Sequence, residues 1–471
     1  MHLTATPASK GPDMPLTLPF DTTYLTLPDR FYSKLNATPV SAPSLIAFNH
    51  TLAAELGLDT AGMSDEDAAR MFSGNEIPHG ATPFAQVYAG HQFGGFSAQL
   101  GDGRALHLGE ITTPNGRVDI QLKGSGPTPY SRNGDGRAWV GPVLREYLMS
   151  CAMQALDIPT TKALAAVATG DPVLREQGRL PGAVLTRVAA SHIRVGTFQY
   201  FAAQRDVEAL QMLTDYTIER HYPEAKGPAQ LLELVMGKQA HLVAKWMSVG
   251  FIHGVMNTDN VSIAGETIDY GPCAFMDNYH PDTVFSSIDR QGRYAYSNQG
   301  PLTHWNLAQF ATSLVVIMPD TDAAIEQFTA ILNQFPALFE DEWAKAFAPK
   351  LGLTHSDETT TLAKELLALM AEAGADFTNT FNALDETEAN YPDWHSKWRA
   401  ANPDDALWRQ TNPAVIPRTH KIEQAIKAAT NDDFAPFRAM LAALQSPFTP
   451  NQAYALPPKD EEKVHQTFCG T

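Results

Sequence analysis

Two contrasting patterns of hydrophobic and polar positions divide the chain. Between residues 84 and 188, apolar and polar positions alternate in short runs separated by glycines, as in "RALHLGEI" and "VDIQLKG", which is typical of half-buried strands. After about residue 201, apolar positions recur every three or four residues, as in "GPAQLLELVMGKQAHLVAKWMSVGF", which predicts long amphipathic helices. We therefore predict an α+β protein in which a small mixed sheet lobe is followed by a large helical lobe.

Three details of local structure follow from the same patterns. The stretch "GPVLREYLMSCAMQAL" is the one clear helix of the sheet region, because its apolar residues share a face and Pro142 suits a first turn. We expect "LGDGR" to form a tight hairpin that joins "GFSAQL" to "RALHLGEI". We also expect "VSIAGETIDYG" to form two short strands around a turn at Gly265.

The texture of the sequence suggests three parts. Residues 1–79 are rich in Pro, Thr and Ser and contain one short amphipathic piece, "SLIAFNHTLAAELGL", so we interpret them as an N-terminal extension wrapped on a domain. Residues 80–200 form the sheet lobe with glycine-rich loops, and residues 201–471 form the helical lobe with a polar C-terminal tail. A chain of 471 residues exceeds the usual single core, so more than one packed lobe is expected.

Charge and hydropathy exclude several classes of partner. A formal net charge of -18 argues against a surface that neutralises nucleic-acid phosphates or anionic lipid. No apolar run approaches the roughly 18 residues that span a bilayer, and the first residues lack the pattern of a signal peptide. We therefore expect a cytoplasmic, soluble protein with no nucleic-acid or membrane partner.

A sheet lobe with one helix before a helical lobe is the arrangement of protein kinases, which suggests where ATP and metal would bind. Lys123 ends the strand "VDIQLK" and Glu146 lies on the helix that follows, as a pair that holds ATP phosphates would. Asn260 follows His253 by 260 - 253 = 7 positions, the kinase spacing of catalytic-loop His and metal-binding Asn. Asp269 opens a D-Y-G triplet, so Asn260 and Asp269 are our predicted Mg²⁺ or Mn²⁺ ligands. The alternative for Lys123 and Glu146 is that both are exposed to solvent, and the alternative for Asn260 and Asp269 is that both are turn residues.

The base of a kinase is missing from this pattern. It would stand two residues after His253, where the chain has Val255. A positioned base contributes roughly 10²–10⁴-fold to the rate, whereas metal and cationic groups carry most of phosphoryl-transfer catalysis. Asp259, next to Asn260, could serve as an alternative base.

Glycines and arginines supply further candidate phosphate ligands. The stretches "YAGHQFGGFSAQLGDGRALHLGE" and "KGSGPTPYSRNGDGRAWVG" are rich in glycine, which lets backbone amides approach a phosphate closely, although the first does not spell the kinase glycine-rich loop. Arg187 and Arg194 lie seven residues apart, close enough to converge on a terminal phosphate. The competing interpretation is that both arginines lie on a face exposed to solvent.

These stretches together resemble the selenoprotein O family of pseudokinases. The resemblance covers nearly the whole chain and rests on "FDTTYLTLPDRFY", "VYAGHQFGGFSAQLGDGRA", "DIQLKGSGPTPYSRNGDGRA", "HGVMNTDN" and "IDYGPCAFMD". It implies a protein-kinase-like two-lobe fold and an ATP-dependent protein adenylyltransferase (AMPylase). The implied reaction transfers AMP, from ATP bound in a flipped orientation, to Ser, Thr or Tyr hydroxyls of proteins, the chain itself included.

The resemblance also implies roles for single residues. Asp259 would be the base, Asn260 and Asp269 would hold the Mg²⁺ or Mn²⁺ ion, and Glu146 would orient Lys123. ATP contacts are implied for Asp269 and for Gly101, Gly103, Arg104, Lys123, Asp135, Gly136, Arg187 and Arg194. An inverted nucleotide would explain why the base is not at position 255.

Two other functions stay open. A conventional protein or small-molecule kinase is disfavoured by Val255 and by the unusual glycine loop. A catalytically silent nucleotide-binding pseudokinase is disfavoured by Asp259 beside a complete metal pair.

The three cysteines are too few for a disulfide framework. Cys273 lies four residues after Asp269, and Cys469 lies in a polar tail where some members of the resembled family carry selenocysteine. We expect a reversible Cys273–Cys469 disulfide that modulates activity; the alternative is two thiols with Cys273 buried behind the site. Cys151 should be part of the core.

Overall fold

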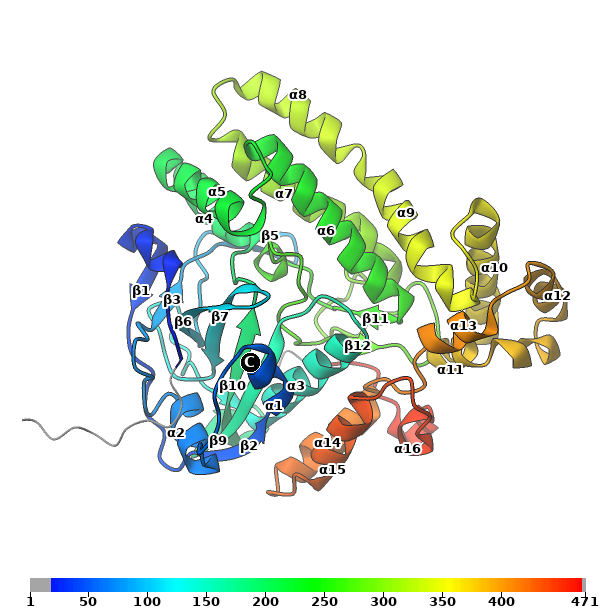
Figure 1. The fold of residues 1–471 in the computed structure, drawn as a ribbon, viewed down its shortest axis with the longest axis horizontal. Helices are drawn as coiled ribbons and strands as arrows, with labels where there is room; N and C mark the ends of the chain where they lie inside the picture. The colour runs from blue at the N-terminus through cyan, green and yellow to red at the C-terminus, as the bar shows by residue number, and fades with distance from the viewer. Residues whose placement is uncertain (1–17, 468–471) are drawn as a thin grey trace, which may run out of the picture.

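The computed structural model describes residues 18–467, in which a large sheet is followed by a chain that is mostly helical (Figure 1). The sheet has the strand order β1-β3-β6-β7-β10-β9-β2, with β8 paired to β10. All pairings in this sheet are antiparallel, so the expected mixed sheet is corrected to an antiparallel one. The strands are β1 Tyr32–Lys34, β2 Ser44–Phe48, β3 Phe84–Gln86, β6 Ala105–Thr113, β7 Gly116–Lys123, β8 Ala138–Trp139, β9 Lys162–Arg175 and β10 Gly178–Ala189.

Two of the expected hairpins are wrong. The segment around Phe96 pairs with the strand before it, as the separate hairpin β4 (Gly90–Gln92) and β5 (Gly95–Ser97), while the "LGDGR" segment turns back along β3. There the backbone N–H of Asp102 donates to the carbonyl of Gln86 at 2.9 Å. Residues 261–271 form isolated bridges in place of two strands, and the short hairpin of this region joins β11 (Phe251–Ile252) to β12 (Ala274–Phe275). The turn at Gly265 is present, with its N–H donating to the carbonyl of Ser262.

Both faces of the sheet are covered. Alternate residues of a strand point to opposite faces, so Val184 and Val188 of β10 pack against helices α1 (His50–Glu55) and α2 (Asp65–Ser73). On the other face, Leu185 packs against α3, the helix that follows β8 in the chain. The N-terminal residues therefore contribute two sheet strands as well as the helices that cover one face.

Helix α3 (Val140–Ala155) confirms the helix predicted in the sheet region. It begins after β8 and carries Pro142 in its first turn. Nearly all of its residues are buried, so the helix is enclosed on all sides. Cys151 is buried in this core, as expected. Helices α14 and α15 pack on α3 from below in Figure 1.

The remaining helices form the region after residue 194. The predicted helix over "GPAQLLELVMGKQAHLVAKWMSVGF" is confirmed as α6, with Pro228 at its first position. The bounds are α4 Val195–Gln204, α5 Val207–His221, α6 Pro228–Ser248, α7 Gln299–Val315, α8 Thr321–Leu332, α9 Phe335–Phe347, α10 Asp357–Ala373, α11 Phe377–Asn382, α12 Pro392–Ala400, α13 Asp405–Thr411, α14 Thr419–Ala429, α15 Ala435–Leu444 and α16 Gln452–Ala455. None of the helices in residues 18–467 combines the length and the apolar character needed to cross a membrane.

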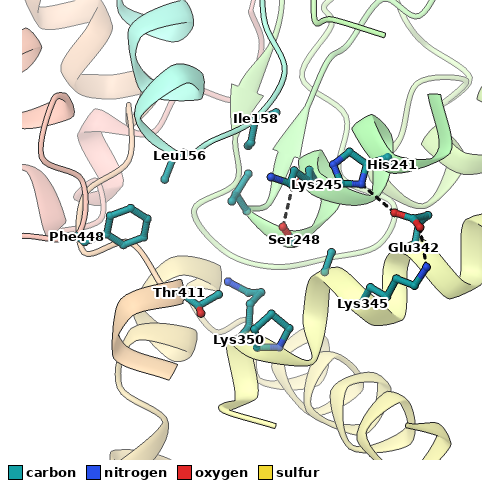
Figure 2. A pocket seen from close by; sticks show the side chains of 13 residues that line it. Leu156, Ile158, His241, Lys245, Ser248, Glu342, Lys345, Lys350, Thr411 and Phe448 are labelled. Carbon is teal, nitrogen blue, oxygen red and sulfur yellow. Dashed lines mark hydrogen bonds and ion pairs between the residues drawn. The ribbon is translucent and has the colours of Figure 1, made fainter. Parts of the chain in front are cut away.

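One cavity of about 320 Å³ lies between the C-terminal half of α6, α9 with the 3₁₀ turn Pro349–Leu351, and Leu156 and Phe448 from other segments (Figure 2). It shares no lining residue with the predicted ATP and metal ligands.

The polar tail approaches the segment that follows Asp269. The hydroxyl of Thr467, the last residue described, donates to the carbonyl of Pro272 at 2.6 Å, directly before the buried Cys273. Cys469 lies outside the described residues, so the disulfide between it and Cys273 stays a prediction.

Candidate functional site

Five charged side chains from distant parts of the chain meet beyond the end of β7. The Asp269 carboxylate accepts hydrogen bonds from Lys123 Nζ at 2.8 Å, from Arg187 Nη1 at 2.8 Å and from Arg194 Nη1 at 3.4 Å. Glu146 lies on the far side, 2.6 Å from Lys123 Nζ and 3.2 Å from Arg187 Nη1. The expected contact between Lys123 and Glu146 is thus present, and two arginines extend it.

Regular structure brings these groups together. Lys123 ends β7, and Arg187 lies on the adjacent strand β10, paired with Gln121. Glu146 lies near the middle of α3, which packs on β10. Arg194 directly precedes α4, so the two arginines converge from a strand and from the start of a helix.

Three cations of this cluster surround the Asp269 carboxylate. Burial alone would raise the pKa of Asp269, but Lys123, Arg187 and Arg194 outweigh it and hold that pKa well below its usual range. Asp269 is therefore ionised at neutral pH, and the three cations face the carboxylates of Asp269 and Glu146, with that of Asp102 3.8 Å from Arg194 Nη2. Three buried cations gathered at one place, in a protein of net charge -18, can bind an anionic group such as phosphate through charge-assisted hydrogen bonds.

Asp259 lies at the edge of the cluster, in the 3₁₀ turn Thr258–Asn260. Arg194 Nη1 bridges the two segments, because it donates to the backbone carbonyl of Asp259 at 2.9 Å as well as to Asp269. Burial raises the pKa of the Asp259 carboxyl to about 6, although a hydrogen bond from Gln92 Nε2 at 3.2 Å opposes the rise. Its Oδ1 atom is buried without a hydrogen-bond partner among the described residues.

The β4–β5 hairpin closes over this carboxylate. Gly90 approaches so closely that a Cβ atom at that position would overlap Asp259 Oδ1. The hairpin is fastened to the same turn by the backbone N–H of His91, which donates to Thr258 Oγ1 at 2.7 Å. The glycine-rich stretch therefore has a steric reason for glycine that the sequence alone did not reveal.

Asn260 and Asp269 each carry oxygen atoms of the kind that bind a hard divalent cation. Asn260 Nδ2 donates to the carbonyl of Val255 at 3.0 Å, which leaves the amide oxygen without a hydrogen bond from the described residues. Asp269 supplies the second donor, and the two segments are tied by His253 Nε2 and the carbonyl of Ile268, 2.9 Å apart. Carboxylate and amide oxygens are the ligands that Mg²⁺ and Mn²⁺ take, so these residues fit the expected ion.

The predicted glycines of the first loop have tight surroundings. Gly101 has φ +91°, and a Cβ there would overlap the Tyr130 ring, while a Cβ at Gly103 would lie 2.8 Å from the Tyr130 carbonyl. The carbonyl of Arg104 accepts from the N–H of Gly124 at 2.7 Å, directly beside Lys123. This loop therefore adjoins the end of β7.

The second predicted loop, which contains Asp135 and Gly136, is held by contacts outside the charged cluster. The Asp135 carboxylate accepts hydrogen bonds from Arg175 at 2.8 and 3.3 Å and from the N–H of Arg137 at 2.9 Å. Gly136 has φ +63° and packs against Gly126, to which its carbonyl is hydrogen-bonded. Within the described chain, the structure does not bring the Asp135 side chain into contact with the charged cluster.

Sequence reasoning missed three residues that support the arginines. Gln121 Oε1 accepts from Arg187 Nε at 3.1 Å and from Nη2 at 2.6 Å. The Tyr88 ring lies under the Arg194 guanidinium, 4.4 Å from its carbon, and the Asp102 carboxylate lies 3.8 Å away. A signal for Gln121 existed in "VDIQLK", where it alternates with apolar residues and shares a strand face with Lys123.

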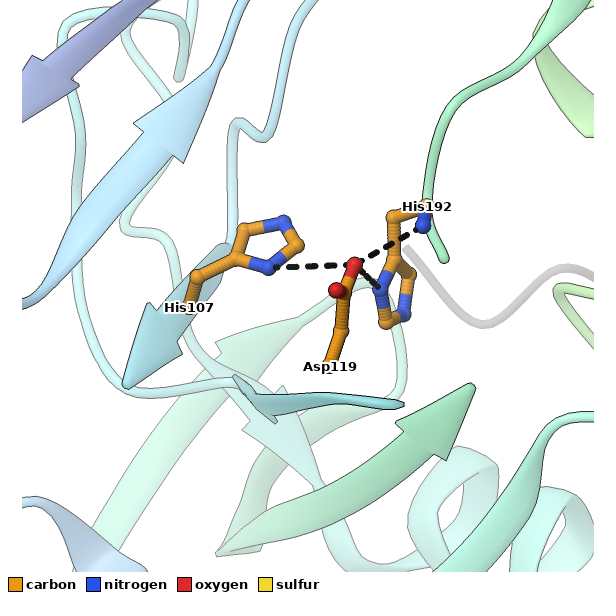
Figure 3. A group of neighbouring side chains, drawn as sticks. All are labelled: His107, Asp119 and His192. Carbon is orange, nitrogen blue, oxygen red and sulfur yellow. Dashed lines mark hydrogen bonds and ion pairs between the residues drawn. The ribbon is translucent and has the colours of Figure 1, made fainter. Parts of the chain in front are cut away.

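Behind Gln121 lies a buried group that has the composition of a metal site: His107, Asp119 and His192 (Figure 3). Asp119 Oδ2 lies 3.0 Å from His192 Nδ1 and 3.8 Å from His107 Nδ1. However, the same oxygen accepts from the backbone N–H of His192 at 2.9 Å, and Oδ1 is paired with Arg220 Nη2 at 2.6 Å. A divalent ion here would stand beside a fixed guanidinium, so we interpret the group as a structural network.

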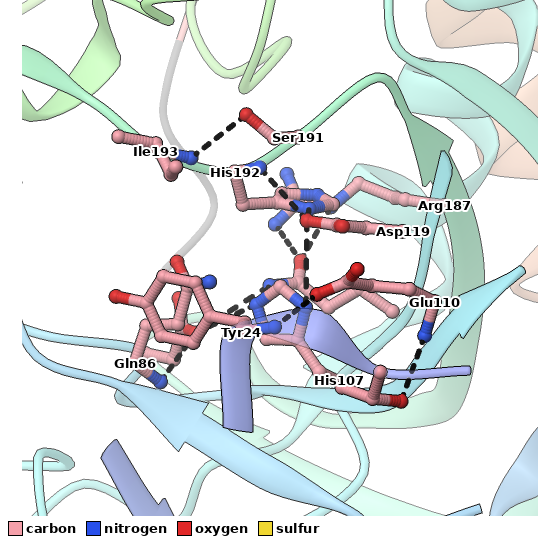
Figure 4. A network of polar contacts seen from close by, with 12 residues as sticks. Tyr24, Gln86, His107, Glu110, Asp119, Arg187, Ser191, His192 and Ile193 are labelled. Carbon is pink, nitrogen blue, oxygen red and sulfur yellow. Dashed lines mark hydrogen bonds and ion pairs between the residues drawn. The ribbon is translucent and has the colours of Figure 1, made fainter. Parts of the chain in front are cut away.

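That network leads to the charged cluster (Figure 4). Burial lowers the pKa of His192 to about 3, so its ring is neutral beside Asp119. His107 Nε2 lies 2.9 Å from Gln121 Nε2, and Gln121 holds Arg187. The amide of Gln121 is therefore fixed from both ends, which orients Arg187 toward Asp269.

Comparisons with known proteins agree over nearly the full length. A family model described as "Protein adenylyltransferase SelO" matches residues 15–404. The Protein nucleotidyltransferase YdiU of Jannaschia sp. (strain CCS1) is 56% identical over 482 residues, covering 97% of this chain and 100% of that protein. Proteins of the same name are 56% identical in Ruegeria sp. (strain TM1040), with coverage of 97% and 100%, and 52% identical in Agrobacterium fabrum (strain C58 / ATCC 33970), with coverage of 96% and 99%.

Proposed function

Because the chain belongs to the SelO family of protein adenylyltransferases, and is thus a nucleotidyltransferase, we propose that it transfers AMP from ATP to Ser, Thr or Tyr hydroxyls of proteins. One observation carries this proposal beyond the family name. The buried cluster gathers three cations around Asp269, with Asp259 at its edge, while apolar Val255 stands where a kinase has its base.

Each charged group has a place in the proposed reaction. Lys123, Arg187 and Arg194 bind the phosphates of ATP. Asn260 and Asp269 hold the Mg²⁺ or Mn²⁺ ion, which neutralises phosphate charge when bound. The glycine loops, with Arg104, Asp135 and Gly136, contact the rest of the nucleotide, as the family pattern suggests.

The transfer itself breaks a phosphoanhydride bond of ATP and forms a phosphodiester bond to the acceptor. Asp259 accepts the proton of the acceptor hydroxyl, whose oxygen forms a bond to the α-phosphorus, and the bond from that phosphorus to the β-phosphate bridging oxygen breaks. Pyrophosphate leaves. A flipped ATP, with its α-phosphorus nearest the acceptor, accounts for a base at position 259 in place of 255.

The arrangement also supports a division into two kinase-like lobes. The last strand of the large sheet ends at Ala189, and nearly all regular structure after it is helical. The charged cluster draws Lys123, Glu146 and Arg187 from the first part and Asp269 from the second. We propose lobes at residues 80–200 and 201–471, with residues 1–79 as an extension that completes the sheet.

Labelled nucleotides test the proposal directly. The protein is incubated with Mg²⁺ or Mn²⁺, a protein mixture and ATP labelled at either the α- or the γ-phosphate. We expect the α-label alone to appear on protein, with an AMP adduct on Ser, Thr or Tyr by peptide mass spectrometry. Transfer of the γ-label would identify a kinase, and ATP binding without either transfer would identify a silent pseudokinase.

A first prediction concerns the pairing of Lys123 with Glu146. Lys123→Met should raise the KM for ATP and lower kcat by about 10²-fold or more, and Glu146→Gln should do the same more weakly, because Glu146 acts through Lys123 and Arg187. The double variant should lose less than the sum of the two single effects. Strict additivity in steady-state kinetics would show that the contact has no role in the reaction.

A second prediction concerns Gln121, which we propose as a positioning residue for Arg187. Gln121→Leu should raise the KM for ATP about tenfold with a smaller change in kcat, because a hydrogen bond to a charged group contributes roughly 1.5–3 kcal/mol. Thr186→Val is the matched control, since it removes a neighbouring buried hydroxyl that has no partner in residues 18–467. Equal KM values for the two variants would refute the role.

A further inference from the structure

Lys350 is a buried lysine without a carboxylate partner among residues 18–467. Its side chain is 3% exposed, and Nζ donates to Asn412 Oδ1 at 2.6 Å. The ammonium also lies 4.4 Å from the ring centroid of Phe381. It forms no ion pair within residues 18–467, whereas the other buried cations described above contact carboxylates. With one neutral hydrogen-bond acceptor, the charged form of this amine is costly to bury, and a carboxylate partner would offset that cost.

The cavity of about 320 Å³ lies beside this residue. In Figure 2, Leu156, Ile158 and Phe448 line one side, and the Lys350 side chain extends from its 3₁₀ turn among the lining residues. Most of the exposed lining surface is apolar, with Val249 and Ala346 adding to it. The volume falls at the lower end of the range of small-molecule sites.

The other charged residues of the lining already have partners. Lys245 pairs with Asp157 at 2.9 Å, while His241 and Lys345 each contact Glu342 at 2.9 Å. Among the described residues that line the cavity, Lys350 is therefore the basic side chain without a carboxylate partner, so an anionic group of a bound ligand could pair with it.

We propose that this cavity binds a medium-chain monocarboxylate, with the carboxylate paired to Lys350 and the hydrocarbon chain packed on Leu156, Ile158 and Phe448. A single negative charge matches the single uncompensated ammonium, and an apolar tail matches the rest of the lining. Burial lowers the pKa of Lys350 to about 7, and a bound carboxylate would favour the charged ammonium.

Isothermal titration of the full chain with sodium octanoate tests the site at pH 7. We expect saturable binding with one molecule per chain, and about fourfold weaker binding for each methylene removed, as in heptanoate and hexanoate, because each buried CH₂ contributes about 0.8 kcal/mol. Octylamine should not bind, because its ammonium would face that of Lys350. Equal binding of octylamine and octanoate would show simple apolar uptake and overturn the proposal.

Variants assign the binding to the residue and to the cavity. Lys350→Met should weaken octanoate binding at least about thirtyfold, whereas Lys345→Met, the same change at an exposed and paired lysine, should leave it within about twofold. Ala346→Phe should abolish binding by filling the cavity while Lys350 stays intact, which keeps the test decisive if Lys350→Met fails to fold. Undiminished binding to Ala346→Phe, or absence of octanoate binding to the native chain, would overturn the site.

Discussion

Asp269→Asn is expected to abolish AMP transfer, with a loss of at least about 10³-fold in kcat/KM for ATP. The substitution keeps the shape of the side chain but removes the charge on which Lys123, Arg187 and Arg194 converge. It also removes the carboxylate ligand of the proposed metal ion, which is needed to neutralise phosphate charge during transfer. The measurement is transfer of α-labelled AMP at saturating metal.

The same variant should separate transfer from nucleotide binding. Without the charge of Asp269, the three cations lose the carboxylate that they share, so metal-free ATP should bind at least as tightly as it does to the native chain. Asp282→Asn, at an exposed acid on the following segment, is the control and should keep both properties. Loss of ATP binding together with transfer would mean that Asp269 maintains the fold of the cluster, and thermal unfolding would then show a large destabilisation.

How far the sequence predicts this structure depends on how local each feature is. Helix α3 was predictable because its apolar face and Pro142 are encoded within a few turns. The "LGDGR" turn was placed in the wrong hairpin, because glycines mark a reversal of the chain but not its partner strand. Here the backbone of Asp102 bonds to Gln86, sixteen residues earlier by 102 - 86 = 16, which no local pattern specifies.

In the candidate site too, features encoded locally were predicted and features that depend on the fold were not. Spacing suggested Lys123 with Glu146, and the structure places them in contact. Gln121 and Tyr88 support the two arginines only because β7, β10 and the start of α4 lie together in the fold, and no local sequence pattern predicts that arrangement. The burial of Lys350 without a carboxylate partner could not be predicted either, because the sequence does not show which residues surround a lysine in the fold.

Asp259→Asn is expected to lower AMP transfer by about 10²–10⁴-fold while ATP binding stays nearly unchanged. The side chain lies at the edge of the cluster and contacts Gln92, whereas Lys123, Arg187 and Arg194 carry the proposed phosphate contacts. Asparagine keeps the size that the close approach of Gly90 requires, so the fold around the β4–β5 hairpin should persist. Single-turnover transfer and equilibrium ATP binding measure the two properties separately.

The position of the base can be tested in the same background. Adding Val255→Asp to Asp259→Asn restores a carboxylate where kinases have theirs, and we expect it to restore neither AMP transfer nor any γ-phosphate transfer. The reason is that the proposed α-phosphorus lies nearest position 259, so a base at 255 would face the wrong part of the nucleotide. Recovery of AMP transfer in the double variant would show that either position can accept the proton, and full activity of Asp259→Asn alone would remove Asp259 from the reaction.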